Sequence, residues 1–218
     1  MIDAIRHEID AKIARLGRTT ASPDPALADW ANRVTALARS VQAFEGALIA
    51  RTIPAALQPA EHLHVVAQAR LTLPRRALEA VEQDQRIALE YTDATGPTRQ
   101  VDLVVFHCRT GRLEFLECKR GTKPIGRDHR RARLRDDAAL ELVGRSYVRK
   151  QFRQIATDCH CLTVSYYGNT GLPEDKTIRA DDLDEHFDWN VRDTVEEHLS
   201  YFRARLDTVF PGVTGVAA

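Results

Sequence analysis

Three side chains that could together activate water lie in two neighbouring apolar segments. Asp102 lies within residues 100–106 (QVDLVVF), and Glu117 and Lys119 lie within residues 112–120 (RLEFLECKR). Two carboxylates a few ångströms apart repel each other, and a hard divalent cation such as Mg²⁺ relieves that repulsion through oxygen ligands. Such a cation polarises a phosphodiester oxygen and lowers the pKa of water, while a nearby lysine orients the water or stabilises charge on the phosphate. These residue types are therefore those of a site in which a bound cation and a lysine activate water.

The chemistry requires the two segments to form a hairpin. Both are rich in β-forming residues, and Arg109-Thr110-Gly111 between them is a turn. Alternation of side chains puts Glu117 and Lys119 on one face of their strand and Asp102 beside Val104 on the other strand. Burying these charges is costly unless they pair with each other or bind a cation. The other interpretation is an ordinary hairpin whose polar residues pair on a solvated face.

The pattern of an acid two residues before a lysine occurs three times, and only its context distinguishes the copies. Asp10-Ala11-Lys12 lies on a predicted helix, where positions two apart face different directions. Glu174-Asp175-Lys176 follows Pro173 in an acidic loop. Glu117-Cys118-Lys119 alone lies on a predicted buried strand, one turn after another strand that contains an acid. We therefore take the third copy as the candidate site.

At these residues the sequence resembles the PD-(D/E)XK nuclease superfamily. Val101-Asp102 matches the first half of its motif, with valine in place of the usual proline, and Glu117-Cys118-Lys119 matches the second half. The resemblance covers roughly Val41 to Tyr167. It implies an α/β fold, the restriction-endonuclease-like mixed β-sheet flanked by helices, here with extra helices at the N- and C-terminal ends.

The resemblance also implies a role for each site residue. Asp102 and Glu117 would be metal ligands together with the main-chain carbonyl of Cys118, and Lys119 would be the catalytic lysine. Members often add an acid from the helix before the sheet, and Glu45 is placed for that role; the alternative is a helix-surface acid paired with a basic neighbour. The implied cofactor is Mg²⁺ or Mn²⁺.

Basic side chains concentrate after the candidate site although the whole chain has no net charge, with 31 basic and 31 acidic residues. Residues 119–135 contain eight basic side chains and one acid, whereas residues 174–188 contain seven acids and two basic residues. A concentrated positive stretch attracts a polyanion locally; the other interpretation is a solvated basic loop. The residues expected to contact nucleic acid are Arg120, Lys123, Arg127, Arg130, Arg131, Arg149, Lys150, Gln151 and Gln154.

Hydrophobic periodicity and breaker residues predict five helices and five strands. The helices are expected at 2–16, 26–53 with Pro54 ending the second, 75–84, 131–157 and 190–209, and the strands at 63–73, 86–91, 100–106, 112–120 and 161–167. We expect an N-terminal helical extension at 1–40, a nuclease-like core at 41–170, and an acidic loop with a C-terminal helix at 171–218, all within one domain overall.

Composition argues against several classes of protein. No apolar run approaches the ~20 residues of a membrane-spanning helix, and the N-terminus lacks the apolar core of a signal peptide. The four cysteines show no regular disulfide spacing, so we expect reduced thiols and a cytoplasmic location. A zinc site that combines His107-Cys108 with Cys159-His160-Cys161 is an alternative that the spacing does not favour.

The sequence thus predicts a metal-dependent endo- or exonuclease, with DNA as the favoured substrate and no membrane partner. Cutting both strands of a duplex would need two active sites, which is compatible with a homodimer. One alternative is a nucleic-acid-binding or interaction module on the same fold without catalysis. Another is a small structural protein whose basic loop binds the acidic surface of a partner.

Overall fold

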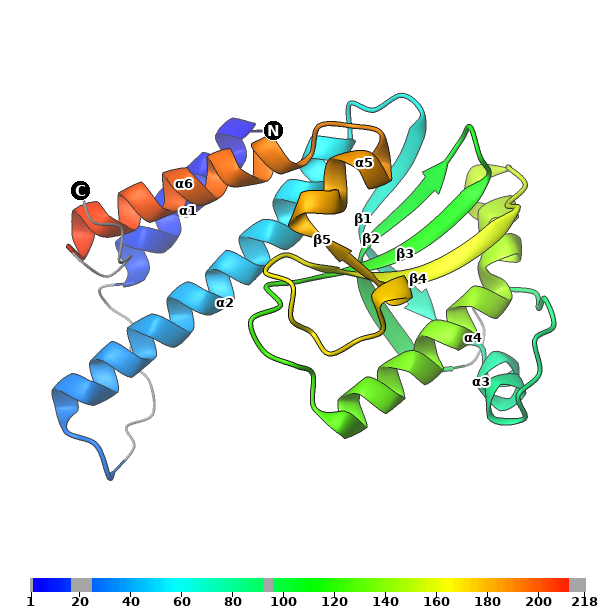
Figure 1. Cartoon of the computed structure of the whole chain (residues 1–218), viewed down its shortest axis with the longest axis horizontal. Helices are drawn as coiled ribbons and strands as arrows, with labels where there is room; N and C mark the ends of the chain where they lie inside the picture. The colour runs from blue at the N-terminus through cyan, green and yellow to red at the C-terminus, as the bar shows by residue number, and fades with distance from the viewer. Residues whose placement is uncertain (1, 17–24, 92–95, 212–218) are drawn as a thin grey trace.

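The computed structural model describes residues 2–16, 25–91 and 96–211, and it has a mixed β-sheet between two groups of helices (Figure 1). One face of the sheet packs against α2 (Asp29–Leu57) and α5 (Leu183–Phe187), and α1 (Ile2–Leu16) and α6 (Arg192–Val209) pack in turn against α2. The other face is covered by α3 (Arg75–Glu82) and α4 (Arg127–Phe152). The α/β class with a helix-flanked mixed sheet is therefore confirmed.

Five strands form the sheet in chain order: β1 (Leu63–Thr72), β2 (Thr98–His107), β3 (Arg112–Lys119), β4 (Asp158–Ser165) and β5 (Thr177–Arg179). The first three are antiparallel neighbours, whereas β3 pairs with β4, and β4 with β5, in parallel. A parallel pair needs a crossover connection, and α4 provides it between β3 and β4.

Alternating apolar residues of the strands supply two hydrophobic cores, one on each face. In β3, Leu116 and Cys118 pack with α2, while Leu113 and Phe115 pack with α4. The core on the α2 face also includes apolar residues of α1 and α6. The boundary expected at residue 40, between the N-terminal extension and the core, falls inside the continuous helix α2. Residues of α1, α2 and the strands belong to the same hydrophobic core.

Most predicted elements are confirmed to within a few residues, but two are wrong. The expected strand at 86–91 is irregular, because its main chain bonds to α4: Leu89 N–H donates to Leu142 O at 2.8 Å, and Tyr91 N–H donates to the Ser146 hydroxyl at 3.0 Å. Pro54 lies inside α2 and does not end it. Burial of the last turn through Leu57 offsets the hydrogen bond that proline removes.

The acidic segment contains structure that periodicity did not predict. Residues 177–179 form the edge strand β5, and residues 183–187 form α5. Both are shorter than the windows in which periodicity is measurable. Two of their residues, Ile178 and Leu183, are buried in the core on the α2 face. The acidic loop is thus partly a structural layer of the sheet.

Side-chain alternation breaks in β1 and β2 at the same level of the sheet. Val66 and Ala69 of β1 both pack toward α4, as do Val104 and Val101 of β2. Residues three apart share a face only if strand geometry is interrupted between them. Gln68, between the two β1 residues, has a positive φ of 53°. The sequence predicts Asp102 on the face of Val104 if side chains alternate regularly along the strand. That alternation is interrupted at Asp102, opposite Gln68.

None of the helices in the described part of the chain has the length and apolar character to cross a bilayer. All four cysteines are free. Among residues 2–16, 25–91 and 96–211, no group of three or more histidine, cysteine, aspartate or glutamate side chains is placed to hold a metal ion. The structure thus gives no support to the zinc alternative.

A fully buried carboxylate at the start of β3 is held by an arginine and two histidines. Glu114 lies 3.2 Å from His107 Nε2, 3.0 Å from His186 Nε2 and 2.9 Å from Arg112 Nε. Burial by itself raises the pKa of Glu114, but the contacts with His107 and His186 outweigh it and lower this pKa from 4.5 to about 2. This cluster joins β2, β3 and α5.

We expect Glu114→Gln to lower the free energy of unfolding by about 3–5 kcal/mol, because Arg112 loses a buried counter-charge and His107 and His186 lose a charged partner. The folded-state pKa of Glu114 lies below its ordinary value, so its stabilisation is complete above about pH 4.5 and is lost as pH falls toward 2. Urea unfolding at several pH values should show a steeper loss in the wild type than in the variant over that range. The exposed Glu185→Gln is the matched control; equal losses in both variants would contradict the prediction.

Candidate functional site

Asp102 lies where the pairing of β2 with β3 ends. The last paired residues are Leu103 and Leu116, although β3 continues to Lys119 beside β4. The N–H of Cys118 therefore has no β2 carbonyl opposite it, and it donates to Asp102 Oδ2 at 2.8 Å. A main-chain donor inside a sheet needs an acceptor. The carboxylate of Asp102 thus has a structural role at the strand end.

Glu117 and Lys119 lie on either side of Cys118 and form an ion pair, with Lys119 Nζ 3.0 Å from Glu117 Oε2. The main chain around Lys119 is well anchored, because Tyr166 N–H donates to Lys119 O at 3.0 Å and Tyr167 N–H donates to Arg120 O at 2.7 Å. The lysine is about half-exposed. The structure therefore brings an acid and an amine together beside the main-chain position that Asp102 holds.

Glu117 also contacts two arginines that sequence reasoning missed. Arg99 Nη2 lies 3.5 Å from Glu117 Oε1, and Arg133 Nη1 lies 3.4 Å from Glu117 Oε2. Both guanidiniums also reach Asp137, at 2.7 Å and 3.5 Å. Burial raises the pKa of Glu117, but Arg133, Lys119 and Arg99 outweigh it, so this pKa is lowered. Glu117 is an ionised carboxylate in a mainly cationic environment.

One signal in the sequence could have found this cluster. Arg133 and Asp137 are four residues apart on a predicted helix, a spacing at which side chains are neighbours. No sequence spacing brings Arg99 to them, because that contact depends on the packing of β2 against α4.

The donor set at this strand end suits a hard divalent cation. Asp102 Oδ1 accepts a hydrogen bond from the side-chain amide of Gln68 at 3.5 Å. In an antiparallel strand the N–H and C=O of one residue point to the same side, so the carbonyl of Cys118 points to the side where its N–H meets Asp102. These two oxygens are donors of the kind Mg²⁺ binds, and the carboxylate of the adjacent Glu117 contacts Lys119, Arg99 and Arg133.

Glu45 belongs to a different cluster. Its carboxylate is buried on α2 and lies 2.5 Å from Arg120 Nε, while the hydroxyl of Tyr167 donates to it at 2.7 Å and Arg203 of α6 lies at 3.4 Å. The side chain of Glu117 reaches α4, on the opposite face of the sheet. The position expected for an additional catalytic acid is therefore occupied by an anchor between α2, α6 and the segment after Lys119.

The residues expected to contact nucleic acid divide into engaged and free side chains. Arg120 binds Glu45, Arg130 Nη1 donates to Gly171 O at 2.9 Å, and Arg149 Nη2 lies 2.9 Å from the carboxylate of Glu90. Three others are exposed in the segment after Lys119 and in the first turns of α4: Lys123, Arg127 and Arg131. The basic segment thus presents three cations near the N-terminus of α4.

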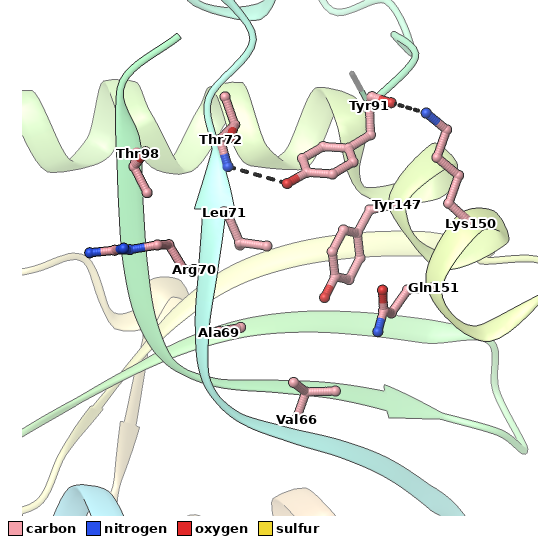
Figure 2. A pocket seen from close by; sticks show the side chains of 10 residues that line it. All are labelled: Val66, Ala69, Arg70, Leu71, Thr72, Tyr91, Thr98, Tyr147, Lys150 and Gln151. Carbon is pink, nitrogen blue, oxygen red and sulfur yellow. Dashed lines mark hydrogen bonds between the residues drawn. The ribbon is translucent and has the colours of Figure 1, made fainter. Parts of the chain in front are cut away.

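Gln151 and Lys150 line a cavity of about 500 Å³ between β1 and α4. Figure 2 shows Gln151 next to Tyr147 in this cavity, while Arg70 points away on the other side of β1. Lys150 donates to the main-chain carbonyl of Tyr91. Gln154 lies beyond the end of α4, because Arg153 adopts a left-handed conformation that terminates the helix. The two glutamines are thus not equivalent, and only Gln151 faces a cavity.

We expect Glu45→Gln to lower the free energy of unfolding by roughly 2 kcal/mol, because Arg120 and Arg203 lose a charged acceptor. Glu197→Gln is the matched control: its carboxylate forms an exposed ion pair with Arg6, and exposed pairs contribute about 0–1 kcal/mol. Chemical denaturation of both variants measures the difference. A Glu45 variant as stable as the wild type would argue against the anchor.

Comparison of the chain with protein-family models, with characterised proteins and with solved structures found no match. The geometry at the end of β3, not similarity to a known protein, is therefore the basis for inferring what the site does.

Proposed function

We propose that this protein is a metal-dependent nuclease with a restriction-endonuclease-like core, and that its active site is the strand end formed by Asp102, Glu117 and Lys119. The single observation that supports the proposal most is the meeting of Asp102 with β3 at Cys118, between an acid and a lysine that contact each other. A purely structural strand end needs one acceptor for Cys118 N–H. It does not need a second acid and a half-exposed lysine beside it.

Each residue has a role in the proposed hydrolysis. Asp102, Glu117 and the carbonyl of Cys118 would hold Mg²⁺ or Mn²⁺. When bound, the cation supplies positive charge that polarises a phosphodiester oxygen and lowers the pKa of nearby water. Lys119 orients the attacking water or stabilises the charge that develops on the phosphate. Water adds to phosphorus and loses a proton, the bond from phosphorus to one sugar oxygen breaks, and that oxygen takes up the proton given up by the water.

We propose DNA as the substrate, held through its phosphates. Lys123, Arg127 and Arg131 are exposed close to the N-terminus of α4, where the helix dipole also favours anions. Contacts to phosphates give affinity without sequence reading. Cleavage of both strands of a duplex would be achieved by a homodimer with two such sites.

A second candidate function is a nucleic-acid-binding or interaction module that does not catalyse. The observation that favours it is the environment of Glu117, whose carboxylate is already neutralised by Lys119, Arg99 and Arg133. A carboxylate in three ion pairs needs no metal for its stability. The two candidates make opposite predictions about cleavage and the same prediction about salt-dependent binding.

We expect the purified protein to cleave DNA in the presence of Mg²⁺ and to stop when EDTA is added. Lys119→Ala and Glu117→Gln should each reduce the cleavage rate by about 10²–10⁴-fold. Asp102→Asn should do so without loss of folding, because the amide oxygen still accepts the N–H of Cys118. The rate of nicking of supercoiled plasmid measures these effects.

Arg192→Ala is the control for the cleavage assay, since Arg192 pairs with Asp181 at the start of α6. It should cleave like the wild type. Folded wild-type protein that binds DNA but does not cleave it with Mg²⁺ or Mn²⁺ would favour the non-catalytic module. Absence of both binding and cleavage would contradict both candidates.

We expect DNA binding to weaken steeply with salt, because each phosphate contact releases counterions. Lys123→Ala and Arg131→Ala should each reduce the slope of log K against log [salt] by about one. Fluorescence anisotropy with a labelled oligonucleotide at several salt concentrations measures the slope. A slope unchanged in the double variant would show that these residues do not contact phosphates.

A further inference from the structure

Two guanidiniums are shared between two carboxylates beside the proposed site. Arg99 of β2 and Arg133 of α4 each contact both Glu117 of β3 and Asp137 of α4. The four side chains are largely buried, with exposed fractions of 12 % for Arg99, 11 % for Arg133, 16 % for Glu117 and 7 % for Asp137. The arrangement is therefore a closed ion-pair cluster and not a set of solvated surface pairs.

The two carboxylates are not held equally. The contact between Arg99 and Asp137, at 2.7 Å, is much closer than either contact with Glu117, at 3.4 and 3.5 Å. Distances near 2.8 Å are typical of charge-assisted hydrogen bonds, and 3.5 Å is at the limit of a direct contact. Asp137 thus anchors Arg99, which reaches Glu117 more loosely, whereas Arg133 lies about equally far from Glu117 and Asp137, at 3.4 and 3.5 Å.

The guanidiniums also have N–H groups without a hydrogen-bond acceptor among the described residues. Arg99 Nη1 is buried and makes no hydrogen bond with the described residues, and Arg133 Nε makes none beyond its ion-pair contact with Asp137 Oδ2 at 3.5 Å. An arginine offers five donors in a planar fork that matches the geometry of a phosphate. A buried donor without a partner costs free energy, so a ligand with several acceptor oxygens would be favoured here.

We propose that Arg99 and Arg133 contact Glu117 when no metal is bound, and that they contact the scissile phosphate instead when a divalent cation binds Glu117. We call this pair of arginines the arginine latch. The inference rests on the proposed function, because it assigns two further residues to that site. Asp137 is the positioning residue, since its close contact with Arg99 and its longer contact with Arg133 both remain when the guanidiniums leave Glu117. Metal and phosphate then bind cooperatively. A metal bound to Glu117 leaves the two guanidiniums without that carboxylate, and the phosphate provides them with a new anionic partner.

The latch predicts metal affinities that change in opposite directions. Without nucleic acid, Arg133→Gln and Arg99→Gln should bind Mn²⁺ about 3–10-fold more tightly than the wild type, because a cation that competes for Glu117 is gone. Asp137→Asn should bind Mn²⁺ more weakly, because the guanidiniums then pair with Glu117 alone. Electron paramagnetic resonance of free Mn²⁺ measures the affinity of the whole chain directly.

Matched controls separate the latch from a general effect of charge. Arg135→Gln removes the same charge from α4, where Arg135 is exposed and pairs with Asp136 at 2.9 Å. Asp136→Asn removes the neighbouring acid. Both controls should bind Mn²⁺ like the wild type. Misfolding cannot explain a gain in metal affinity, so the readout on the two arginine variants is independent of small losses of stability.

A conservative variant tests the phosphate half of the proposal. Arg133→Lys keeps a cation near Glu117 but lacks the planar fork, so its Mn²⁺ affinity should stay close to that of the wild type. Its cleavage rate should still fall, by about 10²-fold, as for loss of one donor to the transition state. Cleavage by Arg133→Lys at the wild-type rate would contradict the proposed contact of Arg133 with the phosphate.

The outcomes distinguish failure of the latch from failure of the proposed function. Wild-type protein that binds Mn²⁺ and cleaves DNA, with affinities unchanged in both arginine variants, would overturn the latch and leave the nuclease intact. Wild-type protein and variants that all fail to bind Mn²⁺, with and without DNA, would overturn both. Tighter binding by the arginine variants and weaker binding by Asp137→Asn, against unchanged controls, supports the latch.

Discussion

The arrangement of the site depends on one interruption of the sheet. Pairing between β2 and β3 ends at Leu103 and Leu116, while β3 continues for three further residues beside β4. The N–H of Cys118 would be left without an acceptor, and the carboxylate of Asp102 provides one. A structural need thus places a negative charge at the strand end. Glu117 and Lys119 flank the same main-chain group, so their position follows from the pairing of β3 with β4.

Charge balance explains why acids can be buried at this strand end without a metal. Lys119, Arg99 and Arg133 together compensate Glu117 and Asp137, and removing one member of a buried pair is costly. A divalent cation that binds Glu117 must displace a guanidinium from that carboxylate. A phosphate can then accept the hydrogen bonds of the displaced guanidinium. The same contacts that stabilise the metal-free protein would therefore couple metal binding to substrate binding.

The sheet separates this cluster from the second buried acid. Glu45 and Arg120 lie on the α2 face, and the bonds of Glu45 with Tyr167 and Arg203 connect β4 and α6 to the residue that follows Lys119. Helix α6 is therefore linked to the end of β3 through ion pairs of Glu45 with Arg120 and Arg203 and not only through apolar packing. Helix α2, with α1 and α6 packed on it (Figure 1), lies on one face of the sheet. Helix α4 contributes Arg133 and Asp137 on the opposite face.

The sequence by itself determined the elements with strong local signals. The periodicity of α1, the β-forming runs on either side of Arg109-Thr110-Gly111, and the context of Glu117-Cys118-Lys119 are local patterns. They predicted the helix, the hairpin and the placement of Glu117 and Lys119 on one face of a strand. The predicted strand at 86–91 was wrong because its hydrogen-bond partners are residues of α4, more than 50 positions away, and no local pattern records them.

Only the tertiary structure decided which charges meet. The break in alternation at Gln68 and Asp102 changes the face of two strands at once, and local propensity does not reveal it. Arg99 reaches Glu117 and Asp137 because β2 packs against α4, and Glu45 is excluded from that cluster because α2 covers the other face. Side-chain type determines which charges can pair, but the layer in which each charge lies depends on how the helices pack on the sheet.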